Sequence, residues 1–288
     1  TSEAAQGNRD LNGDRDNQDE VAQLYQISQK KWINTTLELS FDVALTPKLA
    51  IVGVDERKQG NKDLNGDGDM LDVVAHIWDL TIADADPVAH IINTGQDCSG
   101  GVDADGGIAA FVTAEAAQGN KDLNMDQDTE DDVAQAFILA EKKVVNIGRD
   151  ASGGIAVGAE KVAFVCSEIG QGDKDLNGDK DADDDVLLIY DPSANKVVNI
   201  GYAVDGDLAC AEGTLGWRVL EQDQFDRDLN RDGDTDDSIV FLMDLNRGRF
   251  GSTGHAGGEY LHVNARGAGF AVLELDQGER DLNNDKDL

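Results

Sequence analysis

The sequence predicts an all-β protein built from repeated four-stranded antiparallel units, and three observations lead to this prediction. An acidic segment recurs six times along the 288 residues, and short runs of β-branched and aromatic residues flank each recurrence. No stretch of ten or more residues has the apolar spacing of an amphipathic helix. Because 40% of the residues are hydrophobic, the chain is expected to form a packed core.

The six copies of the acidic segment set the length of the repeat. They begin at Glu3, Glu56, Glu115, Glu168, Glu221 and Glu274. The fourth copy reads EIGQGDKDLNGDKDADDDV, and the Asp of the shared DLN motif follows the previous one by 53, 59, 53, 53 and 53 residues. Regular self-similarity of this kind indicates a repeat architecture. We therefore expect a single repeat domain over residues 1–288, with one structural unit in each repeat.

The segments between the acidic copies predict four strands in each unit. In the fourth repeat, KVAFVCSE from Lys161 precedes the acidic segment and VLLIYDP from Val186 follows it. KVVNIGYAV from Lys196 and GDLACAEG from Gly206 come next, separated by turn signals. Four short antiparallel strands in a repeat of this length are typical of a β-propeller blade, with the acidic segment between the second and third strands. An open β-repeat array or solenoid is the alternative.

The two ends of the sequence fall inside repeats. Thr1 follows an expected second strand, and Leu288 lies within the sixth acidic segment. Four whole blades are therefore expected between two half blades, and the sequence is expected to be a piece of a longer propeller or array. In an open array the edge strands would pair with a neighbouring subunit, as they would in a fibre.

The charge of the chain limits its partners. The formal net charge is −34, and no run of about 18 apolar residues is present for a membrane-spanning helix. Nucleic acid and anionic membranes would repel such a chain. The expected partners are calcium ions, together with copies of the chain itself or a glycan or protein at a surface.

Each acidic segment carries side-chain oxygens at a fixed spacing. With the Asp of the DLN motif as position one, Asp or Asn lies at positions one, three, five and seven of every loop and at position ten of the five complete loops. Alternate residues of a tightly curled loop converge on one centre, and calcium prefers six to eight oxygen ligands. His and Cys are absent from these segments, which disfavours softer metals, and magnesium gives up its water reluctantly. The sequence therefore predicts several calcium ions per chain.

The predicted ligands follow one pattern in five complete loops and a sixth, shorter loop. They are Asp10, Asn12, Asp14, Asp16 and Asp19; Asp63, Asn65, Asp67, Asp69 and Asp72; Asp122, Asn124, Asp126, Asp128 and Asp131; Asp175, Asn177, Asp179, Asp181 and Asp184; Asp228, Asn230, Asp232, Asp234 and Asp237; and Asp281, Asn283, Asp285 and Asp287. The Glu that opens each copy and the Gln three residues later are equally regular. They either brace the loop from behind the ligands or form an exposed strand end and turn.

The DxNxDxD pattern of the loops resembles the calcium-binding loops of EF-hand, dockerin and thrombospondin type 3 repeats. This resemblance implies that calcium is the ligand, and it covers about a dozen residues in each copy. Two features depart from the EF-hand: the central Gly is present only at Gly68 and Gly233, and position twelve lacks a bidentate Glu. Asp at position ten is therefore expected to supply the closing carboxylate.

The flanking strands resemble those of TolB-type propellers. The resemblance depends on GIAAFVTAE from Gly107 and LLIYDP from Leu187. It implies the propeller fold and assigns no catalytic residue. Within this fold the tryptophans and cysteines are expected to pack in the core. These residues are Trp32, Trp78, Trp217, Cys98, Cys166 and Cys210.

Two classes of function fit the sequence. The first, which we favour, is an extracellular or cell-surface structural or adhesive module in which calcium fixes each acidic hairpin, since cytosolic calcium does not saturate weak sites. The second is the propeller domain of a secreted enzyme that acts on carbohydrates or peptides. This domain could itself be catalytic or non-catalytic, and a catalytic site would lie at the axial opening, with Asp103, Asp105 and Asp205, which are expected in Gly-rich turns, as its candidate acidic residues. Because no catalytic constellation is recognised, the chain is predicted not to be an enzyme.

Overall fold

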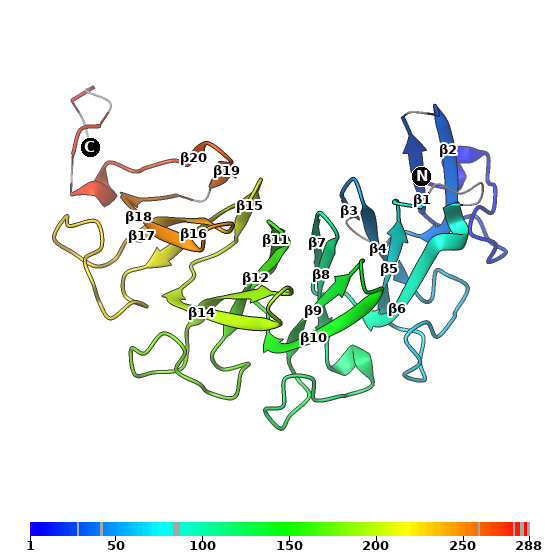
Figure 1. The fold of residues 1–288 in the computed structure, drawn as a ribbon, viewed down its shortest axis with the longest axis horizontal. Coiled ribbons are helices and arrows are strands. Elements are labelled where there is room, and N and C mark those ends of the chain that lie inside the picture. The colour runs from blue at the N-terminus through cyan, green and yellow to red at the C-terminus, as the bar shows by residue number, and fades with distance from the viewer. Residues whose placement is uncertain are drawn as a thin grey trace. The chain divides into compact units, whose positions relative to one another are not determined.

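The computed structural model describes residues 1–27, 29–40, 43–82, 87–258, 260–278, 280–282 and 285–286. Strands and short 3₁₀ helices make up the secondary structure of these residues (Figure 1). The 3₁₀ helices are η1 (Ala4–Gln6), η2 (Pro87–His90), η3 (Ala116–Gln118) and η4 (Leu275–Gln277). The chain divides into two compact units, residues 1–148 and residues 149–288.

The first unit contains a two-stranded sheet and two four-stranded antiparallel sheets. The two-stranded sheet pairs β1 (Val21–Gln26) with β2 (Lys31–Glu38). The next sheet has the order β3 (Val43–Leu45), β4 (Leu49–Asp55), β5 (Val73–Asp79) and β6 (Ile91–Asp97). The third has the order β7 (Val102–Asp105), β8 (Ile108–Ala114), β9 (Asp132–Ile138) and β10 (Lys143–Asp150), and β10 runs past the boundary of the unit.

The second unit contains two further four-stranded antiparallel sheets and a two-stranded sheet. The first has the order β11 (Ile155–Gly158), β12 (Lys161–Ser167), β13 (Asp185–Asp191) and β14 (Lys196–Ala203). The second has the order β15 (Ala209–Ala211), β16 (Thr214–Leu220), β17 (Ser238–Asp244) and β18 (Arg249–Ala256). The two-stranded sheet pairs β19 (His262–Asn264) with β20 (Gly267–Gly269).

The strands of every four-stranded sheet follow one another in chain order, so each sheet is an antiparallel meander (Figure 1). The acidic segment joins the second strand to the third in all four of these sheets, for example β12 to β13. The predicted all-β fold of repeated, propeller-type blades is therefore confirmed. The predicted strand from Lys161 corresponds closely to β12, because its β-branched and aromatic residues are buried against neighbouring strands.

The core lies between successive sheets within each unit. In the first unit the side chains of Ile51 and Ile77 pack in one cluster with those of Phe111 and Phe137 from the next sheet. In the second unit Leu187 joins a cluster that also contains Trp217 and Phe241, whose rings are 5.5 Å apart. Second and third strands are therefore buried on both faces, which explains their almost continuous apolar sequence.

The expected burial of the tryptophans and cysteines holds for most of them. Trp78 and Trp217 are buried, as are Cys98 and Cys166, whereas Cys210 is half-buried. The prediction for the remaining tryptophan, Trp32, is wrong, because its side chain is 66% exposed. It lies opposite Tyr25 in the two-stranded sheet and packs against that ring, with the centroids 4.8 Å apart.

Candidate metal sites

The fourth acidic loop shows how a segment so rich in carboxylates folds. Asp175 at position one accepts hydrogen bonds from the backbone N–H groups of Gly178 (2.5 Å) and Lys180 (3.2 Å). Asn177 accepts one from the N–H of Asp179 at 3.0 Å. The backbone N–H groups of the loop thus donate to side-chain oxygens instead of to the carbonyls of a neighbouring strand. The backbone therefore curls around the side chains of Asp175 and Asn177.

The same turn forms in all five complete loops. Position one accepts the N–H groups of positions four and six in each of them. Position six has a left-handed backbone even where Gly is absent, with φ of 87° at Arg15, 93° at Gln127 and 93° at Lys180. The departure from the EF-hand sequence at this position therefore leaves the turn intact.

The Glu that opens each copy lies beneath the loop. Glu168 is fully buried, and its Oε1 accepts hydrogen bonds from the N–H groups of Leu176 and Asn177. Its Oε2 accepts a longer bond, 3.3 Å, from the N–H of Asp184 at position ten. Glu3, Glu56, Glu115 and Glu221 are equally buried and accept the N–H of position two in the same way.

Three carboxylates converge in each complete loop: the opening Glu and the Asp residues at positions seven and ten. One oxygen from each lies within 4.8 Å of the other two. The triads are Glu3, Asp16 and Asp19; Glu56, Asp69 and Asp72; Glu115, Asp128 and Asp131; Glu168, Asp181 and Asp184; and Glu221, Asp234 and Asp237. Two of the three were predicted from the sequence, whereas the opening Glu was expected only as a brace or a strand end.

Two other predicted ligands, at positions three and five, are hydrogen-bonded to members of this triad. Asn at position three donates a hydrogen bond from Nδ2 to the position-ten carboxylate in every complete loop, over 2.5 to 3.0 Å. Position five uses a carboxylate oxygen to accept the N–H of position seven. In each complete loop, the position-three amide nitrogen is therefore bonded to the triad, while its oxygen accepts the N–H of position five.

Burial and crowding perturb the position-ten carboxyls. Removal from water raises the pKa of Asp19 and Asp72 to about 6, and that of Asp131, Asp184 and Asp237 to about 7. The bond from the position-three Asn lowers these pKa values, and neighbouring carboxylates raise them further. Each loop therefore holds negative charge where it is poorly solvated, a setting that a bound cation would stabilise.

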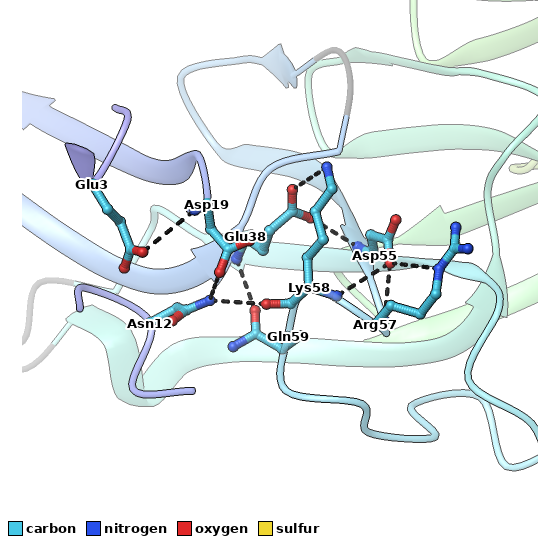
Figure 2. A network of polar contacts seen from close by, with 8 residues as sticks. All are labelled: Glu3, Asn12, Asp19, Glu38, Asp55, Arg57, Lys58 and Gln59. Atoms are coloured by element: carbon cyan, nitrogen blue, oxygen red, sulfur yellow. Dashed lines mark hydrogen bonds and ion pairs between the residues drawn. The ribbon is translucent and has the colours of Figure 1, made fainter. Parts of the chain in front are cut away.

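The first loop also contacts the following repeat. Figure 2 shows Asn12 donating from Nδ2 both to Asp19 and to the carbonyl of Lys58 in the second copy, each over 3.0 Å. In the same view, the side chain of Gln59 accepts a hydrogen bond, 2.7 Å long, from the backbone N–H of Glu38, the last residue of β2. The loop and the fourth strand of one repeat are thus both bonded to the short turn that opens the next copy.

These contacts between repeats recur within both units. Asn65, Asn177 and Asn230 donate to the carbonyls of Ala117, Asp223 and Asp276 over 2.8 to 3.1 Å. Gln118, Gln171 and Gln224 accept the N–H groups of Asp97, Asp150 and Ala203 over 2.9 to 3.2 Å. The Gln is thus neither exposed nor bonded to its own loop through this oxygen: its regular spacing corresponds to a buried bond to the preceding repeat.

The sixth loop is described only in part. Glu274 accepts the N–H of Leu282 at 2.6 Å, and Asp281 accepts the N–H of Lys286 at 3.1 Å, as in the complete loops. Asp285 is also described, whereas the predicted ligands Asn283 and Asp287 lie outside the described residues. The part that is described follows the common pattern.

The acidic residues considered for catalysis lie apart from the loops. Asp103 and Asp105 belong to β7, so their expected placement in turns is wrong, because both residues pair with β8. Asp205 accepts a hydrogen bond from the Ser238 hydroxyl, and its carboxylate lies 3.7 Å from Nη2 of Arg218. These contacts stabilise the join between β14 and β15.

The fold and the loops define a class: an all-β repeat protein with propeller-type blades and one acidic hairpin in each blade. No protein family and no curated protein sequence matches the chain. Among the described residues, no helix has the length and apolar character required to cross a membrane.

Several solved structures are similar to the chain at low identity. TolB from Acinetobacter baumannii is 11% identical with a TM-score of 0.39, over 81% of this chain and 47% of TolB. The β-propeller domain of the Trilobed protease from Pyrococcus furiosus is 10% identical with a TM-score of 0.39, over 74% and 56% of the two chains. A puromycin-hydrolyzing peptidase from Mycobacterium tuberculosis is 11% identical with a TM-score of 0.39, over 77% and 30%. The chain thus spans about half of these structures or less.

Proposed function

We propose that this chain is a calcium-binding structural or adhesive module of an extracellular or cell-surface protein. In this proposal each acidic loop binds calcium through the oxygens of positions one, three, five, seven and ten, and the bound ion fixes the connection between the second and third strands. The observation that carries the proposal is the fivefold recurrence of the same carboxylate triad, in which the opening Glu is fully buried and the position-seven Asp is exposed, with the same hydrogen bonds.

The chemistry of the loops favours calcium among the common cations. The available donors are carboxylate and amide oxygens, and calcium accepts many such ligands in flexible geometry. Zinc and other borderline metals prefer His and Cys, which the loops lack. Magnesium requires near-octahedral geometry and keeps much of its water, so the crowded loops suit it less well.

The location follows from the affinity expected of such sites. Calcium sites in extracellular modules have dissociation constants of about 10⁻⁴ to 10⁻³ M, which extracellular calcium saturates. Ions that bind only the folded state stabilise it, and several sites add their effects. We therefore place the protein outside the cell, where it would contact copies of itself or a surface glycan or protein, and we assign it no catalytic turnover.

Metal analysis and thermal unfolding test this proposal together. Chelator-treated protein would be titrated with calcium or magnesium while bound ions are counted by native mass spectrometry and the Tm is followed by circular dichroism. We expect at least one calcium ion for each of the five complete loops and a rise in Tm that magnesium does not match. Protein that binds no calcium and keeps the same Tm would overturn the proposal.

The loop carboxylates provide the matching variants. Replacing Asp181 and Asp184 by Asn should remove the ion from the fourth loop and leave the other loops filled. The control is Asp191→Asn, at the far end of β13, where Asp191 accepts hydrogen bonds from Ser193. If both proteins bind as many ions as the wild type, the acidic loops are not the calcium sites.

A further inference from the structure

We propose that the Glu that opens each copy is itself a calcium ligand, so that each site includes the end of the second strand as well as the loop. The residues are Glu3, Glu56, Glu115, Glu168 and Glu221. This inference rests on the proposed calcium binding and adds to it a ligand that lies outside the loop pattern, seven residues before position one.

In the five complete copies, the second oxygen of the opening Glu lacks a strong partner. Oε1 accepts the N–H of position two, but Oε2 of Glu221 is buried and accepts no hydrogen bond from the described residues. In the other four complete copies Oε2 accepts the N–H of position ten over 3.3 to 3.5 Å, at the long limit of such a bond. A buried carboxylate oxygen that is so weakly bonded is costly, and a cation would supply the missing partner.

The distances within each triad suit a single ion. Calcium lies about 2.3 to 2.6 Å from each ligand oxygen, so two ligands on opposite sides of it are about 4.6 to 5.2 Å apart. The three carboxylate oxygens of each triad lie within 4.8 Å of one another. All three can therefore bind one ion without movement of the backbone.

Strand pairing fixes this arrangement. The N–H of the opening Glu donates to the carbonyl of the position-ten Asp in every complete copy, over 2.9 to 3.1 Å. Glu168 and Asp184 are thus held side by side at the point where β12 and β13 separate. A bound ion would join the two strands where their ladder of hydrogen bonds ends.

The opening Glu also replaces a ligand that the loops lack. The residues at position twelve are Val21, Val74, Val133, Val186 and Ile239, and all are fully buried in the strand core. An EF-hand loop has a bidentate Glu there, on the chain that leaves the loop. In this protein the corresponding carboxylate comes from the chain that enters the loop, which frees position twelve for the core.

Three substitutions at the fourth loop separate direct ligation from the alternatives. Glu168→Gln keeps an acceptor for the backbone N–H groups but removes the charge. Glu168→Asp keeps the charge, but its side chain is one methylene group shorter, so the carboxylate lies farther from the ion. Asp185→Asn removes one negative charge next to the same loop, at an exposed residue outside the triad. Bound calcium would be counted by native mass spectrometry at a free calcium concentration that just saturates the wild type, and Tm measured without metal would report on folding.

Direct ligation predicts that both Glu168 variants bind one ion fewer than the wild type and that Asp185→Asn binds the full number. The affinity of the fourth loop for calcium should fall by about tenfold to hundredfold or more, because mutation of residues that only support a metal ligand already costs about that much. Equal weakening in Glu168→Gln and Asp185→Asn, with full binding by Glu168→Asp, would show that Glu168 acts only through its charge. Full binding by Glu168→Gln would show that it only braces the loop, and either result would overturn the inference. Wild-type protein without calcium would instead overturn the proposed function itself.

Discussion

The strands and the acidic loops of one repeat obtain their stability in opposite ways. In the sheet of β11 to β14, Phe164 and Leu187 are fully buried among apolar neighbours, and their strands bond directly to each other. In the loop between these strands, Asp181 and Asp184 lie with Glu168 in a triad of like charges. The strand core is complete with the protein's own atoms, whereas the loop gathers charge that a cation would balance.

This contrast shows that one repeat combines a core whose stability changes little with solution conditions and a loop whose stability depends on pH and calcium. Hydrophobic burial between sheets depends little on pH or calcium, but the loop carboxylates respond to both. Changes to solution conditions should therefore act on the loops, and changes to buried apolar residues should act on the sheets. The following predictions test that division, beginning with the change that affects all loops at once.

The largest effect is expected from pH in the absence of calcium. Burial raises the pKa of the position-ten Asp residues from 3.8 to about 6 or 7, so the folded chain holds protons that the unfolded chain has lost. The metal-free protein should therefore lose stability as pH rises from about 4 to 7, because folding then requires charged, buried carboxylates. With calcium the loss should be smaller, since the ion favours the same charged carboxylates.

Thermal melts at pH 5, 6, 7 and 8, with and without calcium, would measure this effect. The difference in Tm between the two conditions should widen as the pH rises. A metal-free Tm that increases between pH 5 and pH 7 would contradict the assignment of the loops as the pH-sensitive region.

The next largest effect is expected in the core. Replacing Trp217 by Ala should reduce the free energy of unfolding by about 3 to 5 kcal/mol, because it empties a large, fully buried site between two sheets. Trp32→Ala is the matched control, since that ring is 66% exposed. Urea unfolding in saturating calcium would measure both, and similar losses in the two variants would show that burial does not set the difference.

A smaller loss is expected where the repeats meet. Gln224→Ala leaves the N–H of Ala203 and the carbonyl of Gly201 without their side-chain partners, and should cost about 1 to 3 kcal/mol. Gln222, two residues earlier in the same turn, is exposed, so Gln222→Ala should have little effect. The same urea experiment checks this pair. Equal midpoints in the two variants would mean that the buried bond contributes nothing measurable.

The smallest loss is expected at the turn that faces the preceding loop. Gly60 has φ of 79°, and a Cβ there would lie 3.2 Å from Cβ of Asp14. Gly60→Ala should therefore cost about 1 to 2 kcal/mol through its left-handed backbone alone. Gly251→Ala in β18 is the control, because a Cβ at Gly251 would have no neighbouring atom within 4 Å and the backbone there is not left-handed. A Gly60→Ala protein with the Tm of Gly251→Ala would exclude this strain.

The sequence was sufficient to predict where the strands lie and how each acidic loop turns. Runs such as residues 161–167 are long enough and apolar enough to define a buried strand, and the spacing of Asp and Asn defines the curled loop beside it. Both signals are local, since they depend on residues that are neighbours in the chain. Trp32 was misplaced because exposure depends on which sheet lies opposite, which residues near it do not specify.

For the opening Glu and the Gln that follows it, the sequence left two roles open, a brace behind the loop or an exposed strand end and turn. Glu168 contacts residues 8 and 16 positions later, and Gln171 bonds to the N–H of Asp150, 21 positions earlier. Their regular recurrence showed that both matter, but only the strand register places one under the loop and the other against the preceding repeat. Distances of this kind depend on pairing between strands, which spacing along one repeat does not reveal.

The bonds between repeats bear on how such a chain grows during evolution. The second and fifth copies each contain both halves of the contact: an Asn that donates forward, and a carbonyl and a Gln that bond to the repeat before. A duplicated gene segment of one repeat length would therefore encode a unit that can form these hydrogen bonds with the repeats on both sides of it without any new substitution. Chain length can then change by unequal recombination, while every unit keeps its own acidic loop.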